Sequence, residues 1–284
     1  MSVTNELNAT PLPGSLARVS SLSVSIVVYR LDETELALNL NTLRRACEQA
    51  ALTDAALTLI DNSEQGTQAR ELHALAEKTG WPLASVLSGH GNVGYGAGHN
   101  LAISASKAPA HLVLNPDVEL DVGALRAGLA TLALSGVVLV GAVGRDAVGN
   151  PGYLSKRMPS VWTFFLRGFA PAWLKRRCDA QLAYYEYRDL PNDRVSDVIL
   201  VSGAFMLCRT AALRAVDGFD ERYFLHFEDL DLSLRIARQG RVVSDPQVSL
   251  IHHGGNSASR GFGHLRVFVR SGLRFFNTHG WRLI

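Results

Sequence analysis

The chain has 284 residues, of which 47% are hydrophobic and 19% charged, and this balance excludes a largely disordered protein. Its formal net charge of +2 carries no global signature of nucleic-acid binding, so we expect no nucleic-acid partner. The longest apolar runs, such as residues 198–207, fall well short of the roughly 20 residues that a membrane-spanning helix needs.

Residues 1–20 have no apolar core of signal-peptide length, and they predict a flexible tail. The three cysteines are widely separated, which favours reduced thiols in a cytoplasm over a disulfide framework or a metal cluster. We therefore expect a cytoplasmic protein.

Strand and helix patterns alternate along the first half of the chain. Short β-branched or apolar runs predict strands at 23–29, 55–63, 82–89 and 110–120. Helical spacing of apolar residues predicts helices at 33–50, 67–80 and 99–106. This alternation predicts an α/β fold with a single, mostly parallel sheet that is flanked by helices.

The second half is less regular. Residues 135–143 predict a further strand, and 146–197 form a long loop or subdomain rich in Pro, Arg and aromatic residues. A buried strand follows the turn at 201–205, a helix is predicted at 228–239, and strand patterns return at 241–245 and from 248 on. Residues 264–284 predict a basic amphipathic helical segment.

Two segments carry basic and aromatic residues without acids, one at 156–177 and the other in the tail. They predict peripheral contact with the inner face of the cytoplasmic membrane. The alternative is that Phe268, Phe275 and Phe276 pack on the domain while the arginines are simply solvated.

The loop at 88–100 contains a G-x-G-x-x-G pattern at Gly89, Gly91 and Gly94. A dinucleotide-binding pattern belongs in the first strand-to-helix turn of its fold, whereas two predicted strands precede this loop. The position argues against hydride transfer. The glycines can instead serve tight turns and close approach of the backbone.

Polar residues follow three of the predicted strands, namely Asp61, Asn92 and Asp117. Because the carboxyl ends of parallel strands meet at one edge of a sheet, we expect these residues to converge on a ligand crevice. Each has a structural alternative: Asp61 could close a turn, Asn92 could take a positive φ, and Asp117 could cap a helix.

A set of motifs in fixed order carries a resemblance to a known family. The motifs are SIVVY, LIDNS, NVGYGAGHN, LVLNPD, VSGAFMLCR, GFDERYFLHFEDLDLSLRI and IHHGGNS. Their order resembles the family 2 glycosyltransferases of the GT-A fold, in particular the rhamnosyltransferase-like branch, over residues 23–257. The resemblance implies a domain at 21–260, with a nucleotide-binding half at 21–120 and an acceptor-binding half at 121–260, followed by the C-terminal segment at 261–284.

The resemblance also implies roles for individual residues. The nucleotide-sugar would contact Tyr29, Asp61, Asn92, Gly94, Asn115, Ser202 and Gly203. Asp61 would pair with the base, and Asp117 with His252 would hold a divalent cation, Mg²⁺ or Mn²⁺, on the diphosphate. The family's D-x-D metal motif is reduced here, because Asn115 replaces its first acid. For Ser202 and Gly203 the alternative is a tight turn before a buried strand.

Glu228 and Asp229 match an acidic pair of the family, in which the second acid is the base that accepts the proton of the acceptor hydroxyl. The resemblance therefore assigns catalysis to Asp229, with Glu228 beside it binding substrate. The alternative is that both are first-turn acids that complement the helix dipole.

Together these features predict an inverting, metal-dependent transferase. It would move L-rhamnose from dTDP-L-rhamnose onto a glycan or a polyprenyl-linked acceptor for cell-surface polysaccharide synthesis. Nothing in the residues selects thymidine over uridine, so a UDP-sugar remains open. A non-catalytic nucleotide-sugar-binding scaffold is the alternative from another class.

Overall fold

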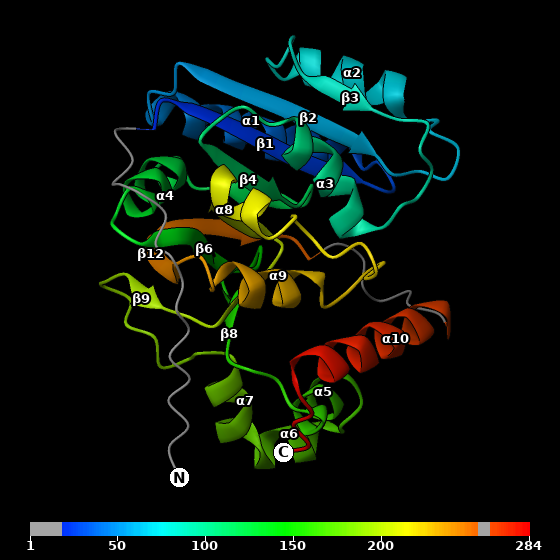
Figure 1. Cartoon of the computed structure of the whole chain (residues 1–284), viewed down its shortest axis with the longest axis vertical. Coiled ribbons are helices and arrows are strands. Elements are labelled where there is room, and N and C mark those ends of the chain that lie inside the picture. The colour runs from blue at the N-terminus through cyan, green and yellow to red at the C-terminus, as the bar shows by residue number, and fades with distance from the viewer. Residues whose placement is uncertain (1–18, 255–261) are drawn as a thin grey trace.

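The computed structural model describes residues 19–254 and 262–284 (Figure 1). The predicted tail at 1–20, apart from its last two residues, and the end of the last motif at 255–257 lie outside the described residues. Cys47, Cys178 and Cys208 are free thiols, as their spacing predicted.

The predicted α/β fold with a mostly parallel sheet is confirmed. The strands that form the path of the main sheet are β1 (Ser21–Val28), β2 (Asp54–Asp61), β3 (Ser85–Leu87), β4 (Ala110–Leu114), β5 (Val118–Leu120), β6 (Val137–Arg145), β11 (Phe205–Arg209) and β12 (Arg241–His252). They lie in the order β3-β2-β1-β4-β11-β6-β12-β5. β1 is parallel to β2 and β4, and β12 is parallel to β6, whereas β11 is antiparallel to both of its neighbours.

The predicted strand at 110–120 is wrong as a single element. β4 lies in the middle of the sheet, while β5 pairs antiparallel with β12 at the far edge. The residues between them, 115–117, cross the carboxyl end of the sheet. β4 is wholly buried, and in β5 Val118 and Leu120 are buried on either side of the half-buried Glu119; the proline at 116 was the available sign of a break between them.

Helices cover both faces of the sheet. On one face lie α1 (Glu33–Gln49), α2 (Ala69–Lys78) and α4 (Ala124–Leu132), whose apolar side chains join the largest core cluster. On the other face lie α3 (Tyr95–Ala105), α8 (Thr210–Ala215) and α9 (Glu228–Ile236), which fill a second cluster. α1 begins where Oδ1 of Asp32 accepts bonds of 3.0 Å from the N–H groups of Thr34 and Glu35.

A buried polar network lies between β1, β4 and α3. Oγ of Ser25 is 2.7 Å from Nδ1 of His99 and 2.8 Å from Nε2 of His111, and Nδ1 of His111 is 2.7 Å from Oγ of Ser23. Burial lowers the pKa of His111 to about 3 and lowers that of His99 well below its usual value. Both imidazoles are therefore neutral in the folded protein at physiological pH.

The irregular segment predicted at 146–197 contains three short helices, α5 (Val161–Gly168), α6 (Ala172–Arg177) and α7 (Asp179–Tyr185). Short strands lie before and after them: β7 (Pro151–Gly152), β8 (Ser155–Lys156), β9 (Ser196–Asp197) and β10 (Leu200–Val201). Figure 1 places α5, α6 and α7 at the opposite end of the molecule from α2.

The C-terminal segment forms α10 (Phe262–His279), as its amphipathic pattern predicted. Phe275 and Phe276 are 0% and 5% exposed and pack with Tyr223 and Phe227, while the ring of Phe268 lies 5.6 Å from that of Phe164. For these three aromatic residues the packing alternative is confirmed. None of the helices in the described ranges combines the length and the apolar composition needed to cross a bilayer.

Candidate functional site

The carboxyl end of the sheet carries a cavity of about 820 Å³. Six segments that are distant in sequence line it: the end of β1 with the loop after it, the start of α3, the crossing between β4 and β5, the turn before β11, the start of α9 and the residues after β12. The predicted site residues on its wall are Tyr29, Asn115, Asp117, Ser202, Gly203, Glu228 and Asp229. In particular, Asp117 and Asp229 line the same cavity, as the mechanism predicted from the resemblance requires.

The start of α9 is held in an uncommon conformation. His226 and Phe227 have φ values of 69° and 70°, a left-handed region that non-glycine residues seldom adopt. Phe227 is the residue before the helix and its ring is buried among aromatic side chains, so tertiary packing maintains the strain. This turn sets the direction in which Glu228 and Asp229 enter the cavity.

Glu228 and Asp229 differ in their surroundings. Glu228 is 4% exposed, its Oε2 accepts no hydrogen bond from the described residues, and burial together with the Asp229 carboxyl raises its pKa well above the usual value. Asp229 accepts bonds of 2.9 Å from the N–H groups of Gly203 and Leu230; burial raises its pKa, and these bonds oppose the rise. Asp229 is therefore the member of the pair that ionises first.

Tyr95 lines both this cavity and a smaller one beside it, and the sequence predictions missed this residue. Its hydroxyl is 2.9 Å from Oδ1 of Asn115 and 2.7 Å from the carbonyl oxygen of Gly203. Burial and the nearby carboxyls raise its pKa, so it remains a neutral phenol. The available signal was its place as the first residue of α3, directly after Gly94.

The candidate metal ligands lie together. Nε2 of His252 is 3.3 Å from Oδ2 of Asp117. The next residue, His253, faces Glu119 instead, as expected for neighbouring side chains on an extended segment. The described residues contain no group of three or more potential metal ligands, so a cation held here would take its other ligands from substrate phosphates and water. One carboxylate with one imidazole fits Mg²⁺ or Mn²⁺ under that condition.

A smaller cavity of about 410 Å³ continues the first, with Tyr29 and Tyr95 on the wall of both. Asn92 and Gly94 line it, and so does Asn62, whose Nδ2 donates a bond of 2.9 Å to the carbonyl of Gly94. Oδ1 of Asn92 in turn accepts from the Gly94 N–H at 3.1 Å. Gly94 has a φ of 93°, and a Cβ there would lie 2.4 Å from the carbonyl oxygen of Phe224. Glycine at this position therefore allows the backbone at residue 94 to lie close to the backbone of Phe224.

Asp61 lies apart from these walls. It is fully buried at the end of β2, and its carboxylate accepts bonds of 3.1 Å from the N–H groups of Ser63 and Gln68. It closes the loop after β2, which is the structural alternative considered for it. Among the predicted site residues, it is the one that lines none of the three cavities around α9.

A third cavity, of about 520 Å³, adjoins the first at the acidic pair. Ser202, Glu228 and Asp229 line both, and His252 lines the third cavity. Its other walls come from residues 151–156 and from α5, α7 and α10. The two carboxyls thus stand at the boundary between two chambers, an arrangement that can bring two substrates to one reacting group.

The comparisons with known proteins agree with this geometry. No protein-family model matches the chain. An N-acetylglucosaminyl-diphospho-decaprenol L-rhamnosyltransferase of Mycobacterium tuberculosis is 32% identical over 200 residues, which cover 63% of this chain and 62% of that protein. The chain therefore matches less than two thirds of that relative's length. The rhamnosyltransferase WbbL of Escherichia coli K12 is 37% identical over 68 residues, or 22% of this chain and 26% of that protein.

Solved structures show the same fold. GalNAc-T7 with UDP, GalNAc and Mn²⁺ superposes with a TM-score of 0.64 at 14% identity, over 92% of this chain and 50% of that one. The mannosyltransferase PcManGT of Pyrobaculum calidifontis, with GDP-Man and Mn²⁺, gives a TM-score of 0.60 at 14% identity, over 92% of this chain and 63% of that one. The predicted resemblance is thereby confirmed.

Proposed function

The chain has the GT-A fold and resembles the family 2 rhamnosyltransferases, and from this premise we propose that it is an inverting, metal-dependent glycosyltransferase. It moves L-rhamnose from dTDP-L-rhamnose onto a glycan or a polyprenyl-linked glycan. The proposal rests on the position of Asp229, which lines the same cavity as Asp117 and also lines the adjoining chamber. A sugar donor in one chamber and an acceptor in the other would meet at this carboxyl.

The sugar donor occupies the 820 Å³ and 410 Å³ cavities in this proposal. Its base and ribose lie along Tyr29, Asn92 and Gly94 in the nucleotide-binding half, 21–120. Asp61 acts through the loop that it closes after β2. The diphosphate lies at Asp117 and His252, which would hold Mg²⁺ or Mn²⁺ there; the cation would supply positive charge beside the leaving group.

Asp229 accepts the proton of the acceptor hydroxyl as that oxygen attacks the anomeric carbon. The bond from the Gly203 N–H holds one carboxylate oxygen in place, and the raised pKa increases the proton affinity of the base. The hydroxyl oxygen forms the new bond to the anomeric carbon while the bond to the diphosphate oxygen breaks. Direct displacement from the opposite side inverts that centre.

The choice of dTDP-L-rhamnose as the donor is the most specific part of the proposal. It is supported by the relatives from M. tuberculosis and E. coli, both of which are rhamnosyltransferases. A thermal-shift panel of dTDP-, UDP- and GDP-sugars with and without Mn²⁺ tests base preference and metal requirement together. We expect dTDP-L-rhamnose with Mn²⁺ to give the largest shift, followed by transfer to a diphospholipid-linked N-acetylglucosamine. If UDP-sugars alone stabilised the protein, the proposed donor would be wrong and a UDP-sugar would take its place. If no nucleotide-sugar shifted the unfolding temperature, the proposed transferase function would be wrong.

A second candidate is a nucleotide-sugar-binding scaffold without turnover. Asn115 in place of an acid favours it, because the Oδ1 of this residue lies 2.9 Å from the Tyr95 hydroxyl rather than being a free carboxylate for a cation. Such a protein would show the thermal shift yet form neither glycosylated product nor free nucleoside diphosphate. The transfer assay with the same donor separates the two.

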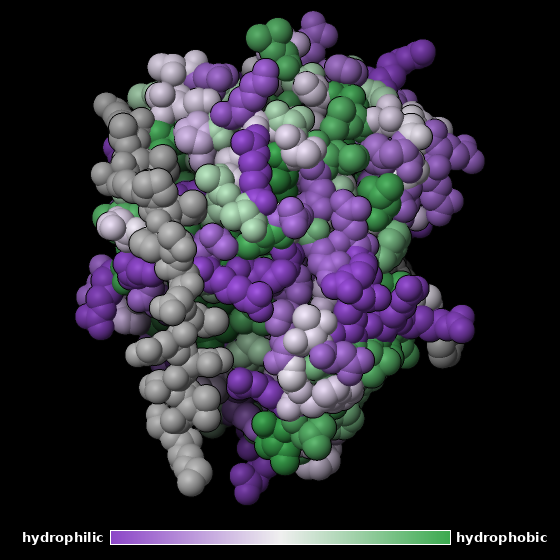
Figure 2. Space-filling model, in the orientation of Figure 1, coloured by the Kyte–Doolittle hydropathy of each residue, from purple (hydrophilic) through white to green (hydrophobic). Residues whose placement is uncertain are grey.

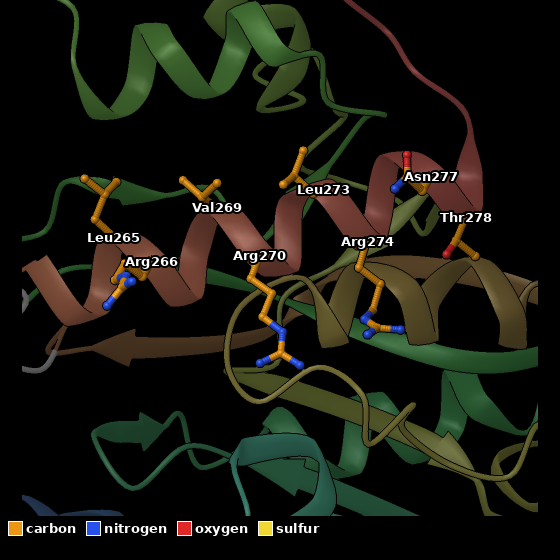
Figure 3. Close-up of a pocket in the computed structure, with 8 residues that line it drawn as sticks. All are labelled: Leu265, Arg266, Val269, Arg270, Leu273, Arg274, Asn277 and Thr278. Atoms are coloured by element: carbon orange, nitrogen blue, oxygen red, sulfur yellow. The ribbon is translucent and has the colours of Figure 1, made fainter.

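Peripheral contact with an anionic membrane surface is also part of the proposal. Figure 3 shows Leu265, Val269 and Leu273 along one side of α10 and arginines along another. These three apolar residues are 40%, 49% and 47% exposed. Exposed aromatic residues of α5 and α6 lie at the lower end of the molecule, where Figure 2 shows a hydrophobic cluster. Apolar side chains beside arginines suit the interface of an anionic bilayer.

Vesicles test this contact. We expect binding to vesicles that contain anionic lipid, and a loss of binding when Leu265, Val269 and Leu273 are all replaced by serine. Replacement of exposed Leu83, which lies before β3, serves as the control. Equal binding of the triple variant, or no binding by the wild type, would remove the membrane contact and leave the transferase proposal unchanged.

A further inference from the structure

Two cationic side chains lie on the wall of the third cavity together with the carboxyls of Glu186, Glu228 and Asp229, and no role described above uses the two cations. Lys156, at the end of β8, and Arg167, on α5, both line this cavity of about 520 Å³. Glu228 and Asp229 line its opposite boundary with the sugar-donor chamber. An anion beside Lys156 and Arg167 would lie in the same cavity as the reacting carboxyl, whose wall also includes His252, while Asp117 lines the sugar-donor chamber.

Lys156 is an unusual lysine because it is only 9% exposed. Its Nζ lies 5.8 Å from the ring centre of Tyr153 and 5.4 Å from that of Tyr185. Of the described carboxylates, none lies within ion-pair distance, 4.0 Å, of this ammonium. Its pKa is lowered to about 7, chiefly by burial; the guanidinium groups of Arg167 and Arg188 contribute to this lowering, and Glu186 opposes it.

Glu186 also lines this cavity, but its carboxylate is shared with an arginine outside the cavity. Glu186 lies 3.9 Å from Nε of Arg167, yet Arg188 holds the same carboxylate more closely at 2.7 Å. Arg167 also packs over the ring of Tyr185 at 5.5 Å, so its guanidinium is positioned while 44% of its side chain stays exposed. Two cations thus face the cavity while the carboxylate among them already has a cationic partner.

A buried ammonium without a counter-ion is costly, and an anionic ligand offsets that cost. Diphosphate oxygens suit both groups, because a lysine acts as a point charge and an arginine as a fork of donors. Aromatic rings complete the walls and offer flat apolar faces to a sugar. The volume also falls within the usual range of small-molecule sites.

We propose that Lys156 and Arg167 bind the diphosphate of a lipid-diphosphate-linked glycan acceptor, with the acceptor sugar between them and Asp229. This inference rests on the proposed transferase function and assigns two side chains to the diphosphate of its acceptor. The sugar donor's diphosphate lies at Asp117 and His252 and needs a cation, whereas the acceptor's diphosphate is held by side chains alone. Acceptor binding should therefore be independent of divalent metal.

Binding measured in EDTA and without a sugar donor tests the subsite. The probes are N-acetylglucosamine joined through a diphosphate to a short alkyl chain, and the matched neutral alkyl glycoside. We expect the wild type to bind the diphosphate probe at least tenfold more tightly. Lys156→Met and Arg167→Gln should each lose most of that preference while their affinity for the neutral glycoside changes little. Lys78→Met, an exposed lysine on α2, is the matched control and should behave as the wild type.

A structural role for Lys156 would give another pattern. If Lys156→Met weakened both probes equally, or if the wild type did not distinguish them, the subsite would be wrong. Lys156→Arg should restore much of the preference, and thermal unfolding near the wild-type temperature shows that each variant is folded. Inorganic diphosphate is the third probe, and an affinity equal to that of the sugar-linked diphosphate would overturn the acceptor assignment.

Binding and transfer assays distinguish a wrong subsite from a wrong function. A protein that keeps the diphosphate preference but transfers no sugar from any nucleotide donor would retain the anion subsite and lose the proposed function. If the protein transferred sugar to both probes with equal Michaelis constants, the proposed transferase function would stand and the anion subsite would be wrong.

Discussion

The backbone N–H of Gly203 donates a hydrogen bond of 2.9 Å to Oδ2 of Asp229. The bond joins the turn before β11 to the first turn of α9, two segments that meet only in the folded chain. The Gly203 carbonyl lies 2.7 Å from the Tyr95 hydroxyl, so the same peptide segment also contacts α3. The orientation of the candidate base therefore depends on three elements at once.

Replacement of Asp229 by asparagine should abolish base function while it preserves shape. General-base catalysis typically contributes about 10²–10⁴-fold, so we expect transfer to fall by at least ~10²-fold with donor affinity nearly unchanged. Because the pKa of Asp229 is raised, the wild-type rate should also decline at a higher pH on the acid side than an ordinary aspartate would give. Steady-state kinetics across pH measures both effects.

Glu228→Gln is the matched comparison. Burial and the Asp229 carboxyl raise the pKa of Glu228, which favours the neutral form of this side chain, and glutamine resembles that form closely. We expect a loss below about tenfold, smaller than the general-base contribution. If Glu228→Gln were as damaging as Asp229→Asn, the roles of the two residues would have to be exchanged.

The pair formed by Asp117 and His252 predicts a metal-dependent sugar donor. We expect EDTA to abolish the stabilisation by the nucleotide-sugar, and Asp117→Asn or His252→Gln to raise the required Mn²⁺ concentration by at least about tenfold. His253→Gln, which removes the partner of Glu119 rather than of Asp117, should shift it less. Donor binding that is insensitive to EDTA would contradict the cation assignment.

Much of this site could be predicted because parallel strands bring their carboxyl ends to one edge. Asp117 and Asp229 were placed in one cavity through the family motifs, and Asn92 with Gly94 through the glycine loop. Asp61 shows the limit of such reasoning. Its position after β2 was predicted, but whether its carboxylate faces a ligand or its own loop depends on where the Ser63 and Gln68 N–H groups lie.

The parts that the sequence did not predict depend on long-range packing. The third cavity needs residues 151–156, α5, α7 and α10 to surround the start of α9, and no local periodicity encodes that arrangement. Tyr95 acquires its role only when Gly203 and Asn115 lie beside it. Lys156 belongs to a basic segment that predicted a solvated or membrane-facing surface, yet it is buried.

Gly94→Ala should disrupt the start of α3. Gly94 has φ 93° and ψ 173°, a region that is essentially restricted to glycine and costs another residue on the order of 1–3 kcal/mol, and the new Cβ would also lie 2.4 Å from the Phe224 carbonyl oxygen. Gly89→Ala is the matched control, because its φ of 86° is similar but no heavy atom lies within 4 Å of the added Cβ. Urea unfolding should show a clearly larger loss for Gly94→Ala. Equal losses would mean that the Phe224 contact relaxes without cost.

The neutral imidazoles beneath β1 predict loss of stability in mild acid. The pKa of His111 is about 3 in the folded protein against 6.5 for a free side chain, so the unfolded chain binds an additional proton below pH 6.5. The free energy of unfolding should therefore fall by about 1.4 kcal/mol for each pH unit below 6.5 from this residue alone, or roughly 2 kcal/mol at pH 5. His99, whose pKa is also lowered, adds to the loss in the same direction.

Urea unfolding between pH 7.5 and 5 measures this slope. His111→Gln can still bond to the serine hydroxyls but does not titrate, so it should flatten part of the slope whatever its stability at pH 7.5. His73→Gln removes an exposed histidine on α2 and should leave the slope unchanged. A wild-type free energy of unfolding that stays constant from pH 7.5 to 5 would show that the buried network accepts a proton as readily as the unfolded chain does.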